Sequence, residues 1–218
     1  MYRILEGGIA PRIRKRKAKI TSNPHGDFMD PEKNPWKTLS TREIYKDARV
    51  LFRADSVIRP DGTKGVYTVL DIPASVAIVP IDTNGKVTLV KEWRYPIKSY
   101  SWGIPMGYID SGEKTLGGAR RELMEESGIT ARSWTNLGRV AQQVARLNNY
   151  CCIYLAQDLT VGPLIRRADE VQERKNIPIR KAIEWCNKGT IVCAISVSGL
   201  FKAAFYLGYL SQQPKLKK

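Results

Sequence analysis

Glycine, glutamate and arginine recur at fixed spacing between residues 107 and 129, and no other feature constrains the fold as strongly. The fixed positions of this segment are Gly107, Glu113, Arg121, Glu122, Glu125, Glu126 and Gly128. Because each of these residue types makes up roughly 5 to 7% of an average protein, such a coincidence arises by chance on the order of once in a billion starting points. The segment therefore predicts one short helix that carries carboxylates for a purpose.

The spacing sorts the side chains of this helix onto two faces. One set follows the i, i+3, i+7 rhythm of a buried stripe and is expected to face the core. This stripe consists of Leu116, Ala119 and Leu123. The carboxylates of Glu122, Glu125 and Glu126 are spaced so that they lie together on another face. Gly107 and Gly128 flank the helix, where a tight turn and a helix end favour positive φ.

A group of carboxylates on one helix face needs an explanation, because like charges repel by about 0.2 to 0.5 kcal/mol per pair on an isolated helix. A hard divalent cation with oxygen ligands, Mg²⁺ with Mn²⁺ as a substitute, offsets this repulsion and bridges to phosphate oxygens. The planar guanidinium of Arg121 is suited to pair with Glu113 or Glu125 and to hold the carboxylates in place. The alternative is a solvated acidic face, the ordinary state of glutamate clusters, and Glu113 alone also suits a capping role.

The remaining residues offer no other set of catalytic groups. The one histidine, His25, lies in a stretch rich in proline and glycine, so neither a histidine-based zinc site nor a Ser/His/Asp triad is expected. The four cysteines lie in apolar runs without C-x-x-C spacing. Neighbouring Cys151 and Cys152 are expected on opposite faces of a strand, as buried thiols in a reducing compartment.

The charge of the chain favours an anionic partner. The net charge is +15, and residues 12–19 hold six positive charges in eight positions. Such a run is either a solvated tail or a contact with nucleic acid or a membrane surface. The first residues lack the long apolar region of a secretory signal, so a cytoplasmic location is expected. The apolar run 192–210 contains Lys202, which favours a buried helix and no membrane span.

Glycine and proline divide the chain into three parts. Residues 1–35 form a basic, Pro/Gly-rich arm, residues 36–212 a catalytic domain and residues 213–218 a basic tail. Strands are expected at residues 38–45, 50–58, 65–70, 75–80, 87–93, 134–144 and 151–156, and helices at 178–187 and 192–211. This order predicts an α/β fold, an α/β/α sandwich with a mixed sheet and an N-terminal extension.

The segment from Gly107 to Ile129 resembles the Nudix box, the signature of hydrolases that cleave nucleoside diphosphates linked to another moiety. Four flanking motifs resemble the ADP-ribose pyrophosphatase and nucleoside diphosphate sugar hydrolase branch of that superfamily. These motifs are residues 34–40, 65–67, 93–96 and 100–107. The resemblance covers residues 34 to 208 and implies a Nudix-type fold.

The resemblance also implies an activity and a set of site residues. Water attacks one phosphorus of a pyrophosphate in a small nucleotide such as ADP-ribose or another nucleoside diphosphate sugar, and a nucleoside monophosphate and a sugar phosphate result. The implied metal ligands are Glu122 and Glu126, then Glu125, and the main-chain carbonyl of Met106. A general base is expected from an acidic loop after the last strand, with Glu170 as first choice and Glu173 as second. Either of these two is equally a solvated loop carboxylate.

Substrate contacts and assembly follow from the same resemblance. Arg94 is expected to contact a substrate phosphate, although a surface arginine at a strand end is as good an interpretation. Trp36 and Trp102 are candidates to stack on a base, and core packing is their alternative. A homodimer that pairs through the N-terminal strands is expected as well.

Two departures from the branch leave other functions open. Gly103 stands where the branch usually has glutamate, and the proline expected near residues 144–145 is absent, which weakens the case for ADP-ribose itself. One alternative is an RNA 5′-pyrophosphohydrolase or decapping-type enzyme that holds RNA phosphates with residues 12–19. The other is a non-catalytic RNA-binding protein on the same scaffold.

Overall fold

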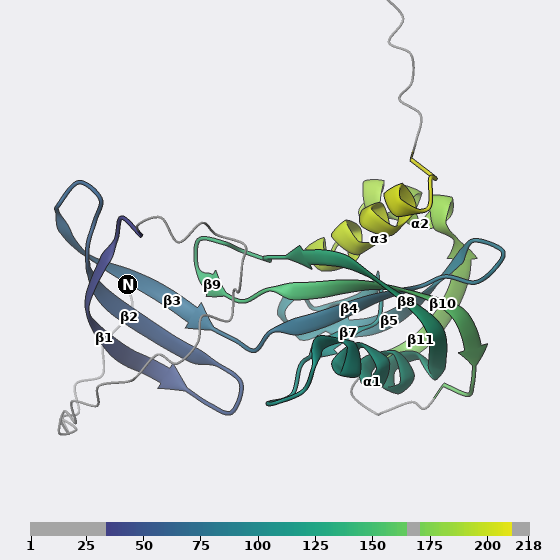
Figure 1. Ribbon diagram of the computed structural model, residues 1–218, viewed down its shortest axis with the longest axis horizontal. Coiled ribbons are helices and arrows are strands. Elements are labelled where there is room, and N and C mark those ends of the chain that lie inside the picture. Colours follow the sequence, from purple (N-terminus) through teal and green to yellow (C-terminus); the bar gives the residue numbers. More distant parts are fainter. Residues whose placement is uncertain (1–33, 165–170, 211–218) are drawn as a thin grey trace, which may run out of the picture.

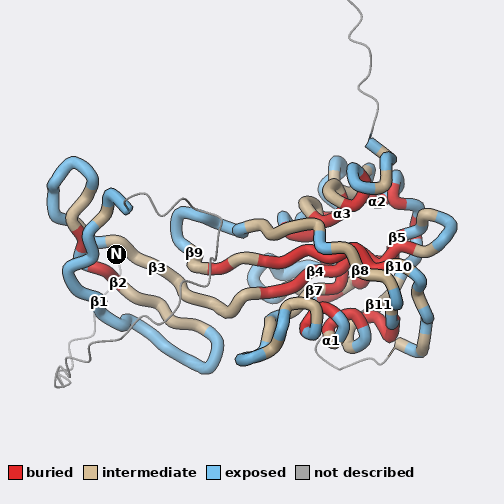
Figure 2. Tube along the Cα trace, in the orientation of Figure 1, coloured by how far each residue is buried: buried red, intermediate tan, exposed pale blue. Residues whose placement is uncertain are grey.

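The fold is described from a computed structural model, which places residues 34–164 and 171–210. The basic run 12–19, Glu170 and the tail 213–218 lie outside the described residues. Figure 1 shows two parts, an N-terminal sheet at the left and a larger body of sheets and helices at the right. Buried residues are concentrated in the body, as Figure 2 shows, so the core of the protein lies there.

The N-terminal sheet is an antiparallel meander of three strands. These are β1 (Lys37–Lys46), β2 (Leu51–Ile58) and β3 (Lys64–Asp71), and the short strand β9 (Leu147–Asn148) adds to β3 in parallel. The turn between β1 and β2 is closed by the carboxylate of Asp47, which accepts hydrogen bonds from the backbone N–H groups of residues 49 and 50. Strand β1 lies at the sheet edge, and all of its residues are exposed.

The central sheet of the body is mixed, as predicted. Its order is β7-β4-β10-β8, and its strands are β4 (Ser75–Pro80), β7 (Met106–Tyr108), β8 (Ile129–Val140) and β10 (Cys151–Val161). Strands β4 and β10 are parallel, and the other pairs are antiparallel. Strand β8 begins at Ile129, directly after the box helix and five residues earlier than the predicted start at residue 134.

A third sheet of order β11-β5-β6 completes the body, with β5 (Lys86–Arg94), β6 (Ser99–Gly103) and β11 (Val171–Pro178). The 3₁₀ turn η1 (Tyr95–Ile97) joins β5 to β6. The prediction of a loop that contains Glu173 is wrong, because Glu173 lies within β11. The sequence VQERKNIP lacks the apolar alternation of a strand because β11 is an edge strand, whose side chains do not all need to be buried.

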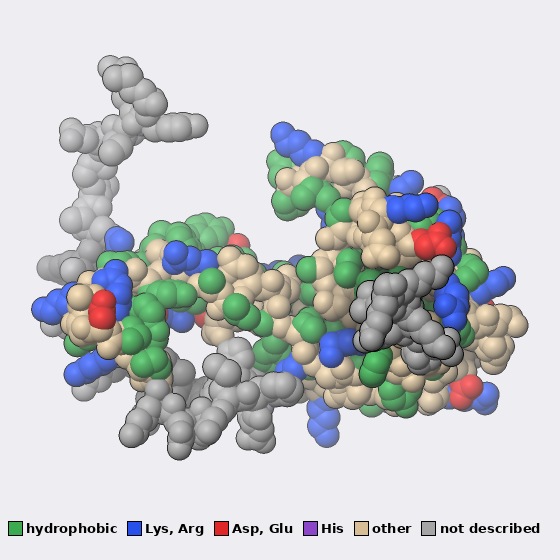
Figure 3. Space-filling model, turned by 90° about the horizontal axis from the view of Figure 1, so that it is seen from above, with side chains coloured by type: hydrophobic (Ala, Val, Ile, Leu, Met, Phe, Trp, Pro, Cys, Tyr) green, Lys and Arg blue, Asp and Glu red, His purple; other side chains and the backbone are tan. Residues whose placement is uncertain are grey.

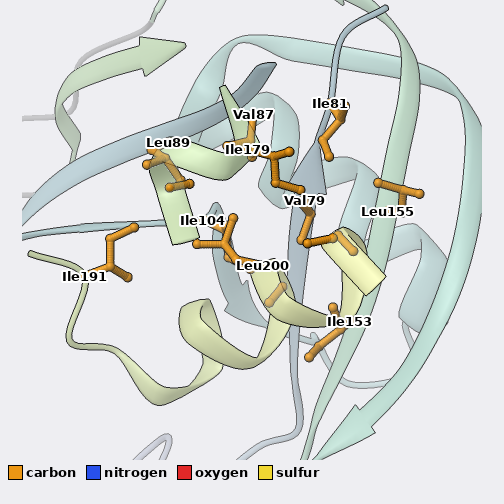
Figure 4. Close-up of a cluster of buried hydrophobic side chains, with 14 of the residues drawn as sticks. Val79, Ile81, Val87, Leu89, Ile104, Ile153, Leu155, Ile179, Ile191 and Leu200 are labelled. Carbon is orange, nitrogen blue, oxygen red and sulfur yellow. The ribbon is translucent and has the colours of Figure 1, made fainter. Parts of the chain in front are cut away.

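Helices cover both faces of the central sheet. Helix α1 (Thr115–Ser127) lies on one face, and α2 (Ile179–Asn187) and α3 (Ala194–Tyr206) lie on the other (Figure 1). Successive side chains of β4 point to opposite faces of the sheet, and each face is covered by different helices. Val76 and Ile78 pack with the buried stripe of α1, while Ala77 and Val79 pack under α2 and α3. Figure 4 shows the hydrophobic cluster under α2 and α3, in which side chains from β4, β5, β10, α2 and α3 meet.

These observations confirm the predicted α/β/α sandwich. Residues Leu116, Ala119 and Leu123 face the core as expected, and Leu123 is fully buried. Cys151 and Cys152 belong to different clusters on opposite faces of β10, and all four cysteines are free thiols. Among residues 34–164 and 171–210, no helix is long and apolar enough to cross a membrane.

Candidate active site

The carboxylate of Glu122 lies against the backbone of Gly107. Glu122 is a residue of α1 and only 8% exposed, and Gly107 belongs to the neighbouring strand β7. A Cβ atom at position 107 would overlap the Glu122 carboxylate. Gly107 does not have positive φ, so the predicted turn conformation is wrong there, whereas Gly128 has φ +65° at the end of α1 as predicted. The first glycine of the box is therefore needed for close approach.

Glu126 contacts the backbone of the neighbouring strand β7. Its Oε2 accepts a hydrogen bond of 2.8 Å from the Met106 N–H. Burial raises the pKa of Glu126 well above its usual value, and the negative charges of Glu92 and Glu122 raise this pKa further. The Met106 hydrogen bond and the positive charge of Arg94 act in the opposite direction. Glu126 therefore lies in an environment of excess negative charge.

Arg121 holds the outer carboxylates together. Its Nη1 lies 2.6 Å from Glu122 Oε1 and 3.3 Å from Glu125 Oε2, and its Nη2 lies 3.0 Å from Glu113 Oε2. The same Nη2 donates to the main-chain carbonyl of Tyr108 at 2.8 Å. The two pairings proposed from the sequence, with Glu113 and with Glu125, are thus both present. These contacts raise the pKa of Arg121 and lower the pKa of Glu113, so both groups stay charged.

Glu92 of β5 is a member of the group that the sequence did not reveal. It is 6% exposed, and its Oε2 lies 2.5 Å from Nη2 of Arg94. The sequence spacing could have indicated this pair, because residues two apart on a strand share a face, and a glutamate and an arginine at this spacing can form an ion pair. Arg94 is thereby placed beside the carboxylates, and its side chain is 40% exposed. Its expected contact with a substrate phosphate stays a prediction.

The structure places two other predicted residues elsewhere. The side chain of Glu173 pairs with Lys91 and Lys175, each at 3.7 Å. Trp102 lies opposite Lys91 in the β5–β6 pair, and its ring contacts Trp185 at 5.8 Å between centroids. Because Lys91 and Glu92 are neighbours on one strand, these groups lie on the face of β5 that points away from the carboxylates. Trp102 also packs against the core under α2 and α3.

The structure also shows the surroundings of Trp36 and of Gly103. Trp36 makes an edge-to-face contact with Tyr67 at 5.4 Å, within the N-terminal part of the chain. Gly103 faces α3, where a Cβ atom would come within 2.8 Å of Ser196 Oγ. The Ser196 hydroxyl accepts a hydrogen bond of 3.2 Å from the Ile104 N–H. A glutamate at position 103 would therefore first meet a buried hydroxyl of α3.

The carboxylate group suits a divalent cation in its chemistry. Five carboxyl groups, those of Glu92, Glu113, Glu122, Glu125 and Glu126, are grouped with the guanidinium groups of Arg94 and Arg121. Carboxylate oxygens are the ligands that Mg²⁺ and Ca²⁺ prefer. No three His, Cys, Asp or Glu side chains of the described ranges form a ready metal cage. The residues therefore fit a divalent cation in type and charge, and Arg121 holds Glu122 and Glu125 in its absence.

A cavity of about 550 Å³ lies between the N-terminal sheet and the segment that follows β8. Arg146 covers the ring of Tyr67 at 5.2 Å, and Arg139 covers the ring of Tyr150 at 5.1 Å, both on its lining. No box carboxylate lines the cavity. The cavity is nevertheless at the same end of the central sheet as the box. The carbonyl of Tyr150 accepts from the N–H of Ser75, which pairs with Tyr108 beside Gly107.

Comparison with known proteins agrees with this geometry. The NUDIX domain model matches residues 71–190, more than half of the 218 residues of the chain. The chain therefore belongs to the Nudix family, and its fold is the Nudix fold. The predicted enzyme class, a Nudix pyrophosphohydrolase, is confirmed. Nudix hydrolases generally use divalent metal ions.

The relatives identify the branch. The chain is 28% identical over 183 residues to an ADP-ribose pyrophosphatase of Mycobacterium tuberculosis, with 82% of this chain and 88% of the relative covered. It is 28% identical over 134 residues to an ADP-ribose pyrophosphatase of Bacillus subtilis, with 62% and 72% covered. A crystal structure of an ADP compounds hydrolase matches the fold with a TM-score of 0.71 at 24% identity, over 80% of this chain and 95% of that one. The chain thus groups with the ADP-ribose pyrophosphatase branch, as the flanking motifs predicted.

Proposed function

We propose that this protein hydrolyses the pyrophosphate bond of ADP-ribose or another nucleoside diphosphate sugar, with Mg²⁺ or, as a substitute, Mn²⁺. The products are a nucleoside monophosphate and a sugar phosphate. The observation that carries this proposal is the position of Glu126 beside the buried Glu122 and Glu92, because buried like charges are costly unless a cation compensates them. The two relatives described as ADP-ribose pyrophosphatases support the choice of substrate.

Each residue of the group has a proposed role. Glu122 and Glu126 supply the primary metal ligands, and Glu125 and the Met106 carbonyl complete the set. When bound, the divalent ion polarises the phosphate, activates water and neutralises the leaving group. Arg121 keeps the carboxylates of Glu122 and Glu125 close together until the ion binds.

The remaining groups act on water and substrate. The oxygen of water forms a bond to one phosphorus, the bridging P–O bond breaks, and the proton of the water goes to a general base. Glu170 remains our first choice for that base. Glu173 is the weaker choice, because its carboxylate pairs with Lys91 and Lys175. Arg94 donates to a phosphate oxygen, since its guanidinium is half-exposed beside the carboxylates.

The cavity beside β3 is our candidate for the nucleoside end of the substrate. Its volume lies within the roughly 300 to 1,000 Å³ of ordinary ligand sites. The guanidinium planes of Arg139 and Arg146 and the rings of Tyr67 and Tyr150 offer flat surfaces on which a base can stack. Figure 3 shows many Lys and Arg side chains and few acidic ones on one face of the molecule, a field that attracts anionic substrates.

We also propose a homodimer that forms through β1. This edge strand is ten residues long, and it exposes Leu39, Ile44 and Tyr45. A long exposed edge strand with apolar side chains favours pairing with a second chain. A second copy would cover both the open edge and these side chains.

The test is product formation from a panel of substrates with Mg²⁺, for the wild-type chain beside Glu126→Gln. The panel holds ADP-ribose, other nucleoside diphosphate sugars, dinucleoside polyphosphates and 5′-triphosphorylated RNA. We expect turnover of a nucleotide sugar, and a loss of at least about a hundredfold in the variant, because a ligand to the metal matters at least as much as its outer-shell partners. Turnover of RNA alone would replace the proposal with the RNA pyrophosphohydrolase. Silence across the panel together with tight RNA binding would favour the RNA-binding protein.

A further inference from the structure

Glu92 is not part of the box, yet it lies with the box carboxylates. Strand β5 alternates its side chains between two faces. Val87 and Leu89 belong to the core cluster under α2 and α3, so Glu92 points to the opposite side, toward α1. Its negative charge is the largest cause, after burial, of the raised pKa of Glu126. Glu92 is therefore an active-site charge that a separate strand supplies.

Arg94 supplies the countercharge. The 2.5 Å ion pair joins a carboxylate whose side chain is 8% exposed to a guanidinium whose side chain is 40% exposed. The pair thus runs from the interior to the surface, with Arg94 at the outer end. The charge of Arg94 also acts on Glu126, where it lowers the pKa. Arg94 therefore lies within electrostatic reach of both Glu92 and Glu126.

We propose that Glu92 is a positioning residue, which holds Arg94 at the mouth of the carboxylate group where the guanidinium meets a substrate phosphate. This inference rests on the proposed function. A guanidinium carries five N–H donors in one plane, so the contact with Glu92 fixes the direction of its other donors. Without the Glu92 carboxylate, Arg94 loses the ion pair that fixes its orientation. The guanidinium then no longer faces the substrate in a fixed direction.

A double-mutant cycle on the full chain tests this role. The variants are Glu92→Gln, Arg94→Gln and the pair, and the measurement is ADP binding by calorimetry at saturating Mg²⁺. We expect each single variant to weaken ADP binding about tenfold, the effect of one charge-assisted hydrogen bond. Because Glu92 acts through Arg94, the double variant should lose no more than the Arg94→Gln variant. Glu92→Asp keeps the charge but shortens the side chain, and it should lie between wild type and Glu92→Gln.

Two further measurements separate this role from others. Mn²⁺ binding without nucleotide, followed by electron paramagnetic resonance, should stay within about twofold of wild type in Glu92→Gln, because a group that is not a ligand changes metal affinity little. Thermal unfolding identifies any variant that has lost its fold, and Arg94→Gln, at a half-exposed position, serves as the folded reference. Weaker Mn²⁺ binding would make Glu92 a metal ligand and overturn the proposal.

The remaining outcomes are equally decisive. Losses in ADP affinity that add to about a hundredfold in the double variant would show independent roles and overturn the proposal. An unchanged affinity in Glu92→Gln, or a wild-type chain that does not bind ADP with Mg²⁺, would do the same. Absence of turnover on every nucleotide sugar would count against the proposed function alone, since the binding cycle needs no catalysis.

Discussion

The carboxylate of Glu122 occupies the space that a Cβ atom at Gly107 would need. Glu122 comes from α1 and Gly107 from β7, so the contact fixes the helix and its carboxylates against the central sheet. The hydrogen bond from the Met106 N–H to Glu126 Oε2 is a second contact between β7 and α1. The box glycine and the box glutamates therefore act as one structural unit.

The substitution Gly107→Ala should inactivate the enzyme while it leaves the fold intact. The new methyl group displaces the flexible end of Glu122 and not the backbone, so we expect a stability loss of only about 1 kcal/mol. Turnover should fall about a hundredfold or more, because a primary metal ligand is displaced. Steady-state kinetics and thermal unfolding measure the two effects.

Gly117→Ala is the matched control for this substitution. Gly117 lies on the same helix α1, and an added Cβ there makes only ordinary contact, at 3.5 Å from Glu113. Because alanine favours a helix over glycine by about 1 kcal/mol, this variant should be as stable as wild type or more so, with turnover retained. Full activity in Gly107→Ala would show that the Glu122 position does not matter.

The helix and its two faces could be predicted from the sequence, because local spacing alone determines them. The positions of Leu123 in the core and of Gly128 at the helix end follow from the 3.6-residue period and from the geometry of helix ends. The reason for Gly107 could not be predicted in this way. It depends on how closely β7 approaches α1, which is a tertiary contact.

The stability of the metal-free protein should fall as pH rises. The pKa of Glu126 is raised in the folded state, so its stabilising contribution is fully present below the ordinary value of about 4.5. Above that pH, Glu126 ionises in the unfolded chain before it ionises in the folded protein. Its contribution to stability therefore decreases as the pH rises and is gone once the pH exceeds the raised pKa of the folded state. Melting temperatures measured in EDTA from pH 4.5 upward should therefore decrease, and Glu126→Gln should remove most of this decrease.

Addition of Mg²⁺ should reverse the effect for the wild-type chain. A cation that binds the ionised carboxylates stabilises the folded state by mass action, and its effect should grow with pH. The Glu126→Gln variant should gain much less. If the melting temperatures of wild type and variant changed with pH in the same way, Glu126 would not titrate as the structure implies.

The thiols of β10 should resist modification in the folded protein. Burial raises the pKa of Cys151 to about 12 and also raises that of Cys152, and Cys151 is inaccessible to solvent. Since the thiolate is the reactive form, labelling by a disulfide reagent at pH 8 should be at least about a hundredfold slower than in denaturant. Mass spectrometry locates the labelled residues. Rapid native labelling at Cys151 would contradict the burial of β10.

Charged substitutions on β1 should dissociate the proposed dimer. Leu39→Lys and Ile44→Lys place charges at half-exposed apolar positions of this edge strand. Sedimentation velocity should show a dimer for wild type and a monomer for the double variant. The control is Val161→Lys, at an exposed position of β10 in the body. A monomeric wild-type chain, or a double variant that still dimerises, would argue against pairing through β1.

The part of the site that lies outside the box was harder to predict. Glu92 lies in a strand whose sequence is typical of a buried core strand. Its role depends on which face of β5 is turned toward α1. Trp102 and Glu173 carried family expectations, yet pairing with Lys91 places both on the other face of the β5 sheet. A shift of one residue along a strand reverses the face, so such positions require the register, which the sequence alone does not determine.

Phosphorus NMR of the reaction mixture tests the central claim most directly. The protein is incubated with ADP-ribose and Mg²⁺, and wild type is compared with Glu122→Gln. We predict two phosphomonoester signals in equal amounts, from AMP and ribose 5-phosphate, which require Mg²⁺ and fall at least about a hundredfold in the variant. Release of ADP, or hydrolysis that persists in EDTA or in Glu122→Gln, would contradict the assignment of pyrophosphate cleavage to the carboxylate group of α1.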